Sequence, residues 1–335
     1  MAWQPGTKLY GDRYTIQREL GQGRFGITYL VRDKKDQDFV IKTLNDQSLR
    51  GSEFERLQQV FVQEAFKLAK CQHPHIVEAR ELFKDKGLWC VVTEYIKGNN
   101  LGKKQQQILP EAKALQYIQQ IGSALIEVHS NGLLHRDVRP GNILIRQDTE
   151  EAVLIDFGLA LDFDRELTTY RTEETMAGFA ARELYSETAK RGAYTDIYAL
   201  GATLYTLITG KIPADALEVA LGKKQLTQPQ EHNPQISDCT NQAILKAMNI
   251  DPSHRPQSVQ EWLAELGLQA ILPERKAHLL KIKKPKFNVN WALFWAAVGA
   301  IGTLLAGIGV PNLVEKFTEK SPPESSQPAT RSAFF

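Results

Sequence analysis

The chain has 335 residues, of which 42% are hydrophobic and 24% are charged. This gives enough apolar material for a folded domain of about 250 to 260 residues and a tail. A net charge of +2 and the lack of a basic stretch interleaved with aromatics give no indication of nucleic-acid binding, and we expect no nucleic acid among the partners. Cys71, Cys90 and Cys239 are isolated, which excludes a zinc-binding spacing and fits a reducing compartment.

The first informative segment is rich in glycine. A helix directly after the glycines would indicate a dinucleotide fold, but Ile27-Thr28-Tyr29-Leu30-Val31 is β-branched and aromatic and therefore typical of a strand. We predict a strand-turn-strand hairpin that lies over phosphate groups. Its nucleotide-binding residues would be Leu20, Gly21, Gln22, Gly23, Arg24, Phe25, Gly26, Ile27 and Thr28.

Two charged residues follow the hairpin. Phe39-Val40-Ile41-Lys42 has the alternation of a strand and ends in a lysine. Glu64 lies in a segment predicted to be helical over residues 53–70. A charged residue on an amphipathic helix usually faces solvent, so Glu64 alone carries little functional weight.

Two polar clusters hold most of the functional information. The first is His135-Arg136-Asp137 with Asn142 five positions past the aspartate, and the second is Asp156-Phe157-Gly158. Asp137 is a carboxylate that could accept a proton from a hydroxyl, and Asn142 and Asp156 offer hard oxygen ligands suited to Mg²⁺. Either triplet alone also occurs by chance, and an Asp-Phe-Gly is an ordinary exit from a strand.

In this order, the motifs resemble those of eukaryotic-type (Hanks-type) serine/threonine protein kinases, over roughly residues 14–265. The resemblance implies an α+β, bilobal protein-kinase-like fold. A β-rich small lobe would span residues 14–96 and a mostly helical large lobe residues 97–268. The implied activity is transfer of the γ-phosphoryl group of ATP to serine or threonine hydroxyls of protein substrates.

The resemblance also assigns roles at the ATP site. Lys42 would contact the α- and β-phosphates, and Glu64 would hold Lys42. Thr93 matches the gatekeeper position, and backbone groups of Glu94 and Ile96 would bond the purine.

The same match assigns the catalytic and metal-binding groups. Asn142 and Asp156 would hold Mg²⁺, or Mn²⁺ in its place. Asp137 would orient the hydroxyl and take its proton, and Arg139 would offset the developing charge.

Elements of the large lobe strengthen the match. Asp196 matches an aspartate that braces the catalytic loop, although Thr195 or Asp196 before an apolar run would also be a reasonable helix N-cap. Arg255 would pair with Glu183. Because Asp196, Glu183 and Arg255 together match the protein-kinase arrangement for binding polypeptide, they argue against a kinase of small molecules.

Three positions depart from the family pattern. Arg139 replaces the usual lysine, Arg182 stands where proline is usual, and Met176 stands where a threonine normally touches the catalytic aspartate. The last two bear on hydroxyl specificity and peptide docking. An ATP-binding pseudokinase that acts as a membrane scaffold is therefore the alternative to an active kinase.

Arg136 directly precedes the catalytic aspartate, which suggests control by phosphorylation of the following segment, because a phosphate there could pair with this arginine. A polar surface loop is the alternative, because hydroxyls are common in loops. The candidate acceptors are Thr168, Thr169, Thr172 and Thr175.

The C-terminal part predicts membrane attachment. Residues 291–310 carry no charge and, at ~1.5 Å per residue, would span ~30 Å as a transmembrane helix, with a buried soluble helix as the alternative. The preceding linker, residues 269–290, is basic, which places the kinase domain in the cytoplasm and offers a contact with anionic lipid. Residues 311–335 are predicted to be a short disordered tail.

Within the broad family, this layout resembles bacterial membrane-anchored kinases, and Gly26-Ile27-Thr28-Tyr29-Leu30 resembles cyanobacterial members. Small side chains on one face of the span predict a homodimer. They are Ala292, Ala296, Gly299, Thr303 and Gly307.

Overall fold

The structure is a computed structural model, and it describes residues 3–22, 26–45, 51–104, 107–157, 178–186 and 188–271. The chain divides into two units, Met1–Asn288 and Val289–Phe335, and all described residues belong to the first. Most of the predicted linker, the predicted span and the predicted tail lie outside the described residues. Within the described part of the chain, no helix combines the length and the apolar character that crossing a membrane requires.

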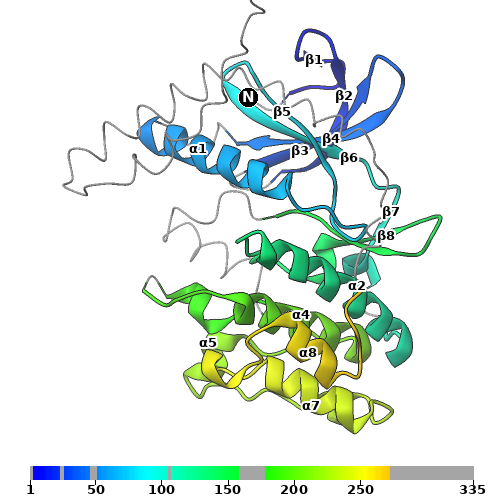
Figure 1. Ribbon diagram of the computed structural model, residues 1–335, viewed down its shortest axis with the longest axis vertical. Coiled ribbons are helices and arrows are strands. Elements are labelled where there is room, and N and C mark those ends of the chain that lie inside the picture. Colours follow the sequence, from blue (N-terminus) through cyan, green and yellow to red (C-terminus); the bar gives the residue numbers. More distant parts are fainter. Residues whose placement is uncertain are drawn as a thin grey trace, which may run out of the picture. The chain divides into compact units, whose positions relative to one another are not determined.

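The small lobe is a six-stranded antiparallel sheet with one helix (Figure 1). Its strand order is β1-β2-β3-β4-β6-β5. The elements are β1 (Lys8–Leu9), β2 (Tyr14–Gln22), β3 (Gly26–Asp33), β4 (Asp38–Leu44), α1 (Gly51–Leu68), β5 (Ala79–Asp85) and β6 (Leu88–Glu94).

The sheet buries both faces because its strands alternate apolar residues on each side. On β6, Cys90 and Val92 join a small-lobe core with Ile27 of β3, whereas Val91 joins the larger core that contains Phe61 of α1. Residues in positive-φ conformations close the tight turn between β5 and β6, where Lys86 has φ 48° and Gly87 φ 83°. This sandwich of helix and sheet fixes the positions of β4 and α1 relative to each other.

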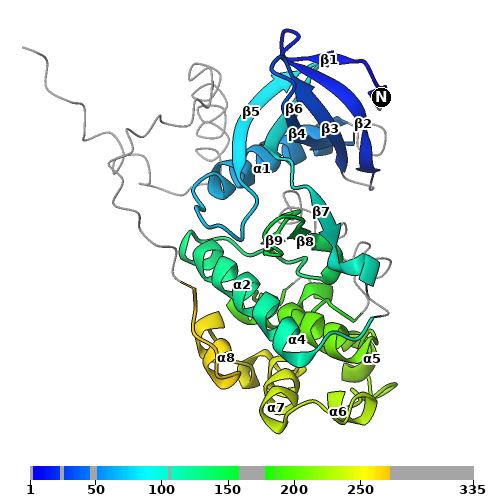
Figure 2. The same ribbon diagram turned by 90° about the vertical axis from the view of Figure 1, so that its right-hand side faces the viewer.

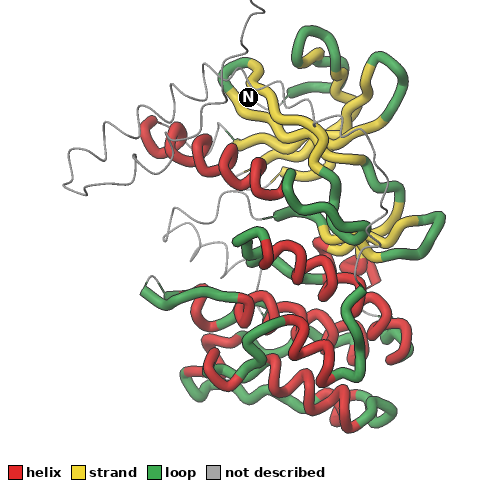
Figure 3. Tube along the Cα trace, in the orientation of Figure 1, coloured by secondary structure: helices red, strands yellow, loops and turns green. Residues whose placement is uncertain are grey.

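The large lobe is mostly helical, as the colouring by secondary structure makes clear (Figure 3). A small sheet of order β7-β8-β9 lies at its upper edge. The strands and α-helices described in this lobe are β7 (Gly98–Asn100), α2 (Glu111–Ser130), β8 (Ile143–Arg146), β9 (Ala152–Leu154), α4 (Ala193–Thr209), α5 (Ala216–Ala220), α6 (Pro229–His232), α7 (Asp238–Ala247) and α8 (Val259–Glu265). Short 3-10 helices are η1 (Leu101–Lys104), η2 (Pro140–Asn142), η3 (Arg182–Tyr185) and η4 (Pro252–His254).

Helix α4 is the centre of the large lobe. Every residue from Thr195 to Thr209 is buried, because α2, α7 and α8 surround the helix. Gly201 lets α7 approach, since a Cβ at this position would lie 2.8 Å from the Cβ of Ala247. The buried hydroxyl of Thr203 donates to the carbonyl of Ala199 one turn earlier, so the threonine leaves no unsatisfied donor in the core.

The two-lobed α+β architecture confirms the fold predicted from sequence. The helix predicted over residues 53–70 spans Gly51–Leu68, and the short strands expected around Ile143 and Val153 are β8 and β9. Strands β1 and β7 were not predicted, because β1 has only two residues and β7 reads Gly-Asn-Asn, residue types that are depleted in strands.

Candidate active site

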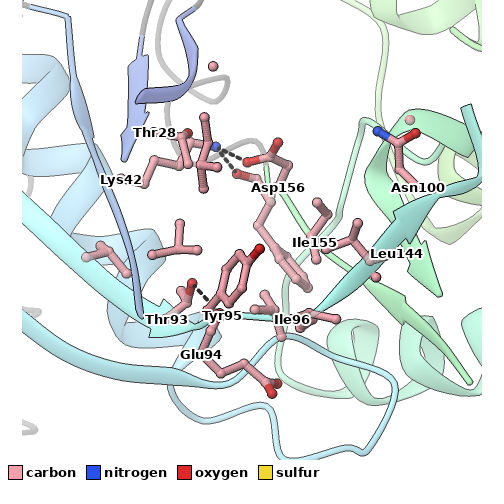
Figure 4. A pocket seen from close by; sticks show the side chains of 18 of the residues that line it. Thr28, Lys42, Thr93, Glu94, Tyr95, Ile96, Asn100, Leu144, Ile155 and Asp156 are labelled. Atoms are coloured by element: carbon pink, nitrogen blue, oxygen red, sulfur yellow. Dashed lines mark hydrogen bonds and ion pairs between the residues drawn. The ribbon is translucent and has the colours of Figure 1, made fainter. Parts of the chain in front are cut away.

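A cavity of about 420 Å³ lies where β2, β3, β4 and β6 face β8 and the segment after β9 (Figure 4). Apolar side chains make much of its wall, and a few polar groups converge in it, which is the usual composition of a small-molecule site. The apolar members include Leu20, Val40, Val77, Val91, Leu144 and Ile155. The polar members include Thr28, Lys42, Thr93, Glu94 and Asp156.

Lys42 and Asp156 point toward one another across this cavity (Figure 4). The Lys42 ammonium lies 3.0 Å from the Asp156 carboxylate and 3.4 Å from the carbonyl of Phe157. The pair joins β4 of the small lobe to the segment after β9. A cation and a carboxylate therefore lie side by side in the wall of the cavity.

Glu64 does not hold Lys42 in this structure, which differs from the pairing that the resemblance implied. Its side chain is buried on α1, but the contacts of Lys42 with described residues go to Asp156 and Phe157. The lysine ammonium therefore pairs with the carboxylate after β9 instead of the carboxylate on α1.

The backbone at Asp156 adopts a left-handed conformation, with φ 57°. Side-chain packing supports this conformation, because the ring of Phe157 lies 4.7 Å from that of His135, centroid to centroid. The Nε2 of His135 also lies 3.0 Å from the carbonyl of Ile155. Left-handed non-glycine residues persist only where their surroundings determine them, and they gather at functional sites.

Asp196 holds the loop that carries His135, Arg136 and Asp137 in place. Its carboxylate, fully buried at the start of α4, accepts hydrogen bonds from the backbone N–H of His135 at 2.9 Å and of Arg136 at 2.7 Å. The Nε2 of His129 lies 2.8 Å from the same carboxylate. Arg136 has φ 62°, a conformation that an arginine rarely adopts, and its bond to Asp196 stabilises it. Asp196 therefore braces the loop. It is not the N-cap of α4, because the helix begins three residues earlier, at Ala193.

The same loop carries Asp137 and Asn142, and both side chains are buried. The amide of Asn142 donates to the carbonyl of Asp137 at 2.8 Å, and the carbonyl of Asn142 accepts from the backbone N–H of Ile155 at 2.9 Å. The Arg139 Nε lies 3.0 Å from a carboxylate oxygen of Asp137. These bonds bring the two polar clusters, which lie apart in sequence, into one site.

Burial and hydrogen bonds together determine the protonation states of Asp196 and His135. Desolvation raises the pKa of its carboxyl, but the hydrogen bond from His129 and the neighbouring imidazoles and N–H groups outweigh this effect, so the pKa lies below its ordinary value. Burial lowers the pKa of His135. A carboxylate and a neutral imidazole therefore support the loop at neutral pH.

The two oxygen donors predicted for a metal fit Mg²⁺. The nitrogen of the Asn142 side-chain amide donates to the carbonyl of Asp137, so the amide oxygen is the atom that could bind a metal. The Asp156 carboxylate lines the cavity. Protein Mg²⁺ sites usually combine one or two such side chains with substrate phosphates. Among the described residues, no group of three or more histidines, cysteines, aspartates or glutamates forms the kind of cluster that zinc requires.

The pair of Glu183 and Arg255 forms as predicted, with nitrogen-oxygen distances of 2.8 and 3.1 Å and both side chains buried. Arg182, which stands where proline is usual, is exposed beside it. Ala181 still has ψ 149°, the extended backbone that a following proline would demand. The arginine therefore leaves the backbone shape and the buried pair intact.

The structure divides the residues that the sequence analysis singled out around the nucleotide and the following segment into three groups. Leu20, Gly21, Thr28, Lys42, Glu94, Ile96 and Asp156 line the cavity. Gln22 ends β2, Gly26 begins β3, and the side chain of Ile27 packs in the small-lobe core. Gly23, Arg24, Phe25, Gly158, the four candidate threonines and Met176 lie outside the described residues.

Sequence reasoning missed several residues that line the cavity. Val40 precedes Lys42 by two positions on the same strand, so strand alternation could have placed both on one face. Leu144 and Ile155 also line the cavity, but their assignment depends on the pairing of β8 with β9. No local pattern gives that information.

Comparison with known proteins agrees with this geometry. The family model described as the protein kinase domain matches residues 14–265. The serine/threonine-protein kinase PrkC of Bacillus subtilis is 33% identical over 270 residues, which are 77% of this chain and 41% of that protein. Serine/threonine-protein kinase B of Synechocystis sp. is 30% identical over 272 residues, 76% of this chain and 46% of the other. The chain thus spans less than half the length of these two curated relatives.

Solved structures show the same fold. The apo form of PpkA-294 superposes with a TM-score of 0.65 at 29% identity, over 79% of this chain and 99% of the other. A mutant of the kinase domain of Mycobacterium tuberculosis PknI gives a TM-score of 0.62 at 25% identity, over 80% of this chain and 98% of the other. Because the family model matches most of its length, the chain belongs to the protein kinase family.

Proposed function

We propose that this protein transfers the γ-phosphoryl group of ATP to serine or threonine hydroxyls of proteins. The observation that carries this proposal is that hydrogen bonds join the loop of Asp137 and Asn142 to the segment that ends in Asp156. The Asp156 carboxylate lines the cavity together with Lys42, 3.0 Å away. The names of the relatives support the same reaction class.

The cavity positions the nucleotide. Its apolar walls suit a purine, with backbone groups of Glu94 and Ile96 at the edge where the purine would bond. The ammonium of Lys42 binds phosphate oxygens when it leaves Asp156. Positioning of the two reactants accounts for much of the catalysis in phosphoryl transfer, because the reaction asks for little covalent chemistry from the protein.

Asp137 and Arg139 act on the hydroxyl side. The Asp137 carboxylate orients the incoming hydroxyl and takes its proton, and Arg139, now on that carboxylate, supplies a cation beside the transferring group. Asn142 and Asp156 would hold Mg²⁺, which neutralises charge on the phosphates when it is bound. Mn²⁺ would suit the same oxygen donors.

The test is phosphate transfer from labelled ATP with Mg²⁺, with an Asp137→Asn variant in parallel and mapping of the labelled residues. Removal of the base should lower the rate by about 10²- to 10⁴-fold. Label on threonine among residues 168–175 in the wild type would in addition support control by phosphorylation opposite Arg136. Unchanged labelling in the variant would reject the assigned role of Asp137.

We also propose that residues 291–310 anchor the protein in a membrane, with the kinase domain on the cytoplasmic side. The uncharged run and the basic residues before it support this topology. Membrane fractionation and protease protection of intact cells test it. We expect the full chain in the membrane fraction with the kinase domain protected, and a chain that is soluble without detergent would contradict the proposal. Binding of the linker to anionic vesicles and crosslinking in membranes test the lipid contact and the homodimer.

A further inference from the structure

The chain returns toward the small lobe after its last described helix, α8. Residues 268–271, which we call the strap, run beside α2 (Figure 2). The side-chain amide of Gln119 donates to the carbonyl of Gln269 at 2.8 Å, and the backbone N–H of Ile271 donates to the hydroxyl of Ser123 at 2.8 Å. Leu268 and Ala270, on the strap, pack against the main core. The strap is therefore built onto α2 by both polar and apolar contacts.

The strap ends on His73. The Nε2 of this buried imidazole lies 3.3 Å from the carbonyl of Ile271. Because its Nδ1 accepts the backbone N–H of His75 at 3.2 Å, the proton of the neutral ring lies on Nε2, which donates to the strap. Burial lowers the pKa of His73 and so favours the neutral ring. One side chain thus joins two segments that are 198 positions apart.

The segment that carries His73, residues 71–78, is bonded to the strand before Asp156. We call it the junction loop. The backbone N–H of Val77 donates to the carbonyl of Leu154 at 3.0 Å, and the N–H of Leu154 donates to the carbonyl of His75 at 2.9 Å. Leu154 ends β9 and lies two residues before Asp156. A shift of the junction loop therefore shifts the carboxylate that faces Lys42.

The junction loop also touches two other parts of the nucleotide site. At its end, the backbone N–H of Glu94 donates to the carbonyl of Glu78 at 3.0 Å, where β6 reaches the edge of the cavity. At its start, the N–H of Cys71 donates to the carbonyl of Leu68, the last residue of α1. One short loop thus holds the ends of α1, β6 and β9.

We propose that the strap is a positioning element of the nucleotide site and that His73 is the positioning residue through which it acts. With the strap in place, the junction loop holds the last turn of α1, the end of β6 and β9 in the geometry that binds ATP. Its effect on affinity rests on the proposed function. The strap includes the first three residues of the predicted basic linker, 269–290, so displacement of residues 268–271 from α2 weakens ATP binding.

The first test is hydrogen exchange of the unliganded full chain, read by mass spectrometry. A Gln119→Ala/Ser123→Ala double variant removes two strap bonds. Its matched control is Gln116→Ala/Ser130→Ala on the same helix, because Gln116 is exposed and the Ser130 hydroxyl bonds within α2. Each lost bond of this kind shifts a local opening equilibrium by about fivefold. We therefore expect amide hydrogen exchange in residues 71–78 and 152–157 to be at least about fivefold faster in the double variant and unchanged in the control.

The second test separates positioning from simple loss of structure. His73→Asn keeps a side-chain acceptor for the N–H of His75 but does not reach Ile271, so it should match the double variant. In both, the dissociation constant of ATP should rise by about three- to tenfold, while kcat at saturating ATP stays within about twofold of the control.

Two results would overturn the proposal. Acceleration confined to residues 266–271, with residues 71–78 and 152–157 exchanging as in the control, would show that the strap supports nothing beyond itself. An ATP dissociation constant equal to that of the control would show that the junction loop does not transmit its effect. If the wild type binds no ATP, the proposed function fails, and exchange at residues 152–157 alone decides the role of the strap.

Discussion

Replacement of Asp196 by asparagine probes how the large lobe supports catalysis. The carboxylate accepts from three donors, at 2.8 Å from His129, 2.9 Å from His135 and 2.7 Å from Arg136. An asparagine has one acceptor oxygen in place of two. If that oxygen keeps the bonds to His129 and His135, the new NH₂ group faces the backbone N–H of Arg136, and two donors meet.

The magnitude follows from this mismatch. An unsatisfied buried donor costs about 1–3 kcal/mol, so Asp196→Asn should lower the free energy of unfolding by this amount. The backbone of Arg136, at φ 62°, loses the bond that holds it. Since Asp137 is the next residue, its carboxylate moves, and a displacement of about 1 Å from the reacting geometry can cost about 10²-fold in rate.

Two assays measure these effects. Urea denaturation followed by the fluorescence of tryptophan, including the fully buried Trp262 in the large lobe, gives the loss of stability. Steady-state kinetics should show a lower kcat and a KM for ATP within about twofold, because Asp196 does not line the nucleotide cavity. Asp251→Asn, at an exposed carboxylate that caps η4, is the matched control. An Asp196→Asn protein with unchanged kcat, or with the loss only in KM, would refute this reasoning.

Other predictions concern single groups. Lys42→Met should raise the dissociation constant of ATP, measured with a fluorescent nucleotide, because it removes the ammonium that lies in the cavity beside Asp156. Arg255→Met should lower the free energy of unfolding by about 3–5 kcal/mol in urea denaturation, because it leaves the Glu183 carboxylate buried without its cation; a loss under 1 kcal/mol would be contrary. Burial lowers the pKa of His135 and of His75, so below about pH 6.5 the unfolded chain binds protons that the folded chain does not. The free energy of unfolding should therefore decrease as the pH is lowered, by ~1.4 kcal/mol per pH unit for each histidine. Stability that is flat between pH 7 and 5 would contradict that assignment.

Local sequence patterns predicted the parts of the site that each strand or loop carries by itself. Lys42 follows the apolar alternation of Phe39-Val40-Ile41, and Asp156 follows an apolar run, so both were visible as polar groups after apolar segments. The structure places both in the cavity, 3.0 Å apart. The order of the motifs, more than any one of them, indicated the fold.

Other features depend on contacts between segments that are far apart in the chain. Ile27 lies in a motif for nucleotide binding, yet strand alternation turns its side chain into the small-lobe core. The link between His73 and Ile271 has no local signal, since it needs both lobes and the end of α8 to be in place. The choice of Lys42 between Glu64 and Asp156 likewise depends on how α1 and β9 are positioned.

The measurement that tests the central claim most directly is transfer of labelled phosphate from ATP with Mg²⁺ by the full chain, beside the Asp137→Asn variant, with ATP binding measured on both. We predict label on serine or threonine that falls by about 10²- to 10⁴-fold in the variant, while both proteins bind ATP. ATP binding without any transfer by the wild type would contradict the proposed activity and would support the pseudokinase scaffold.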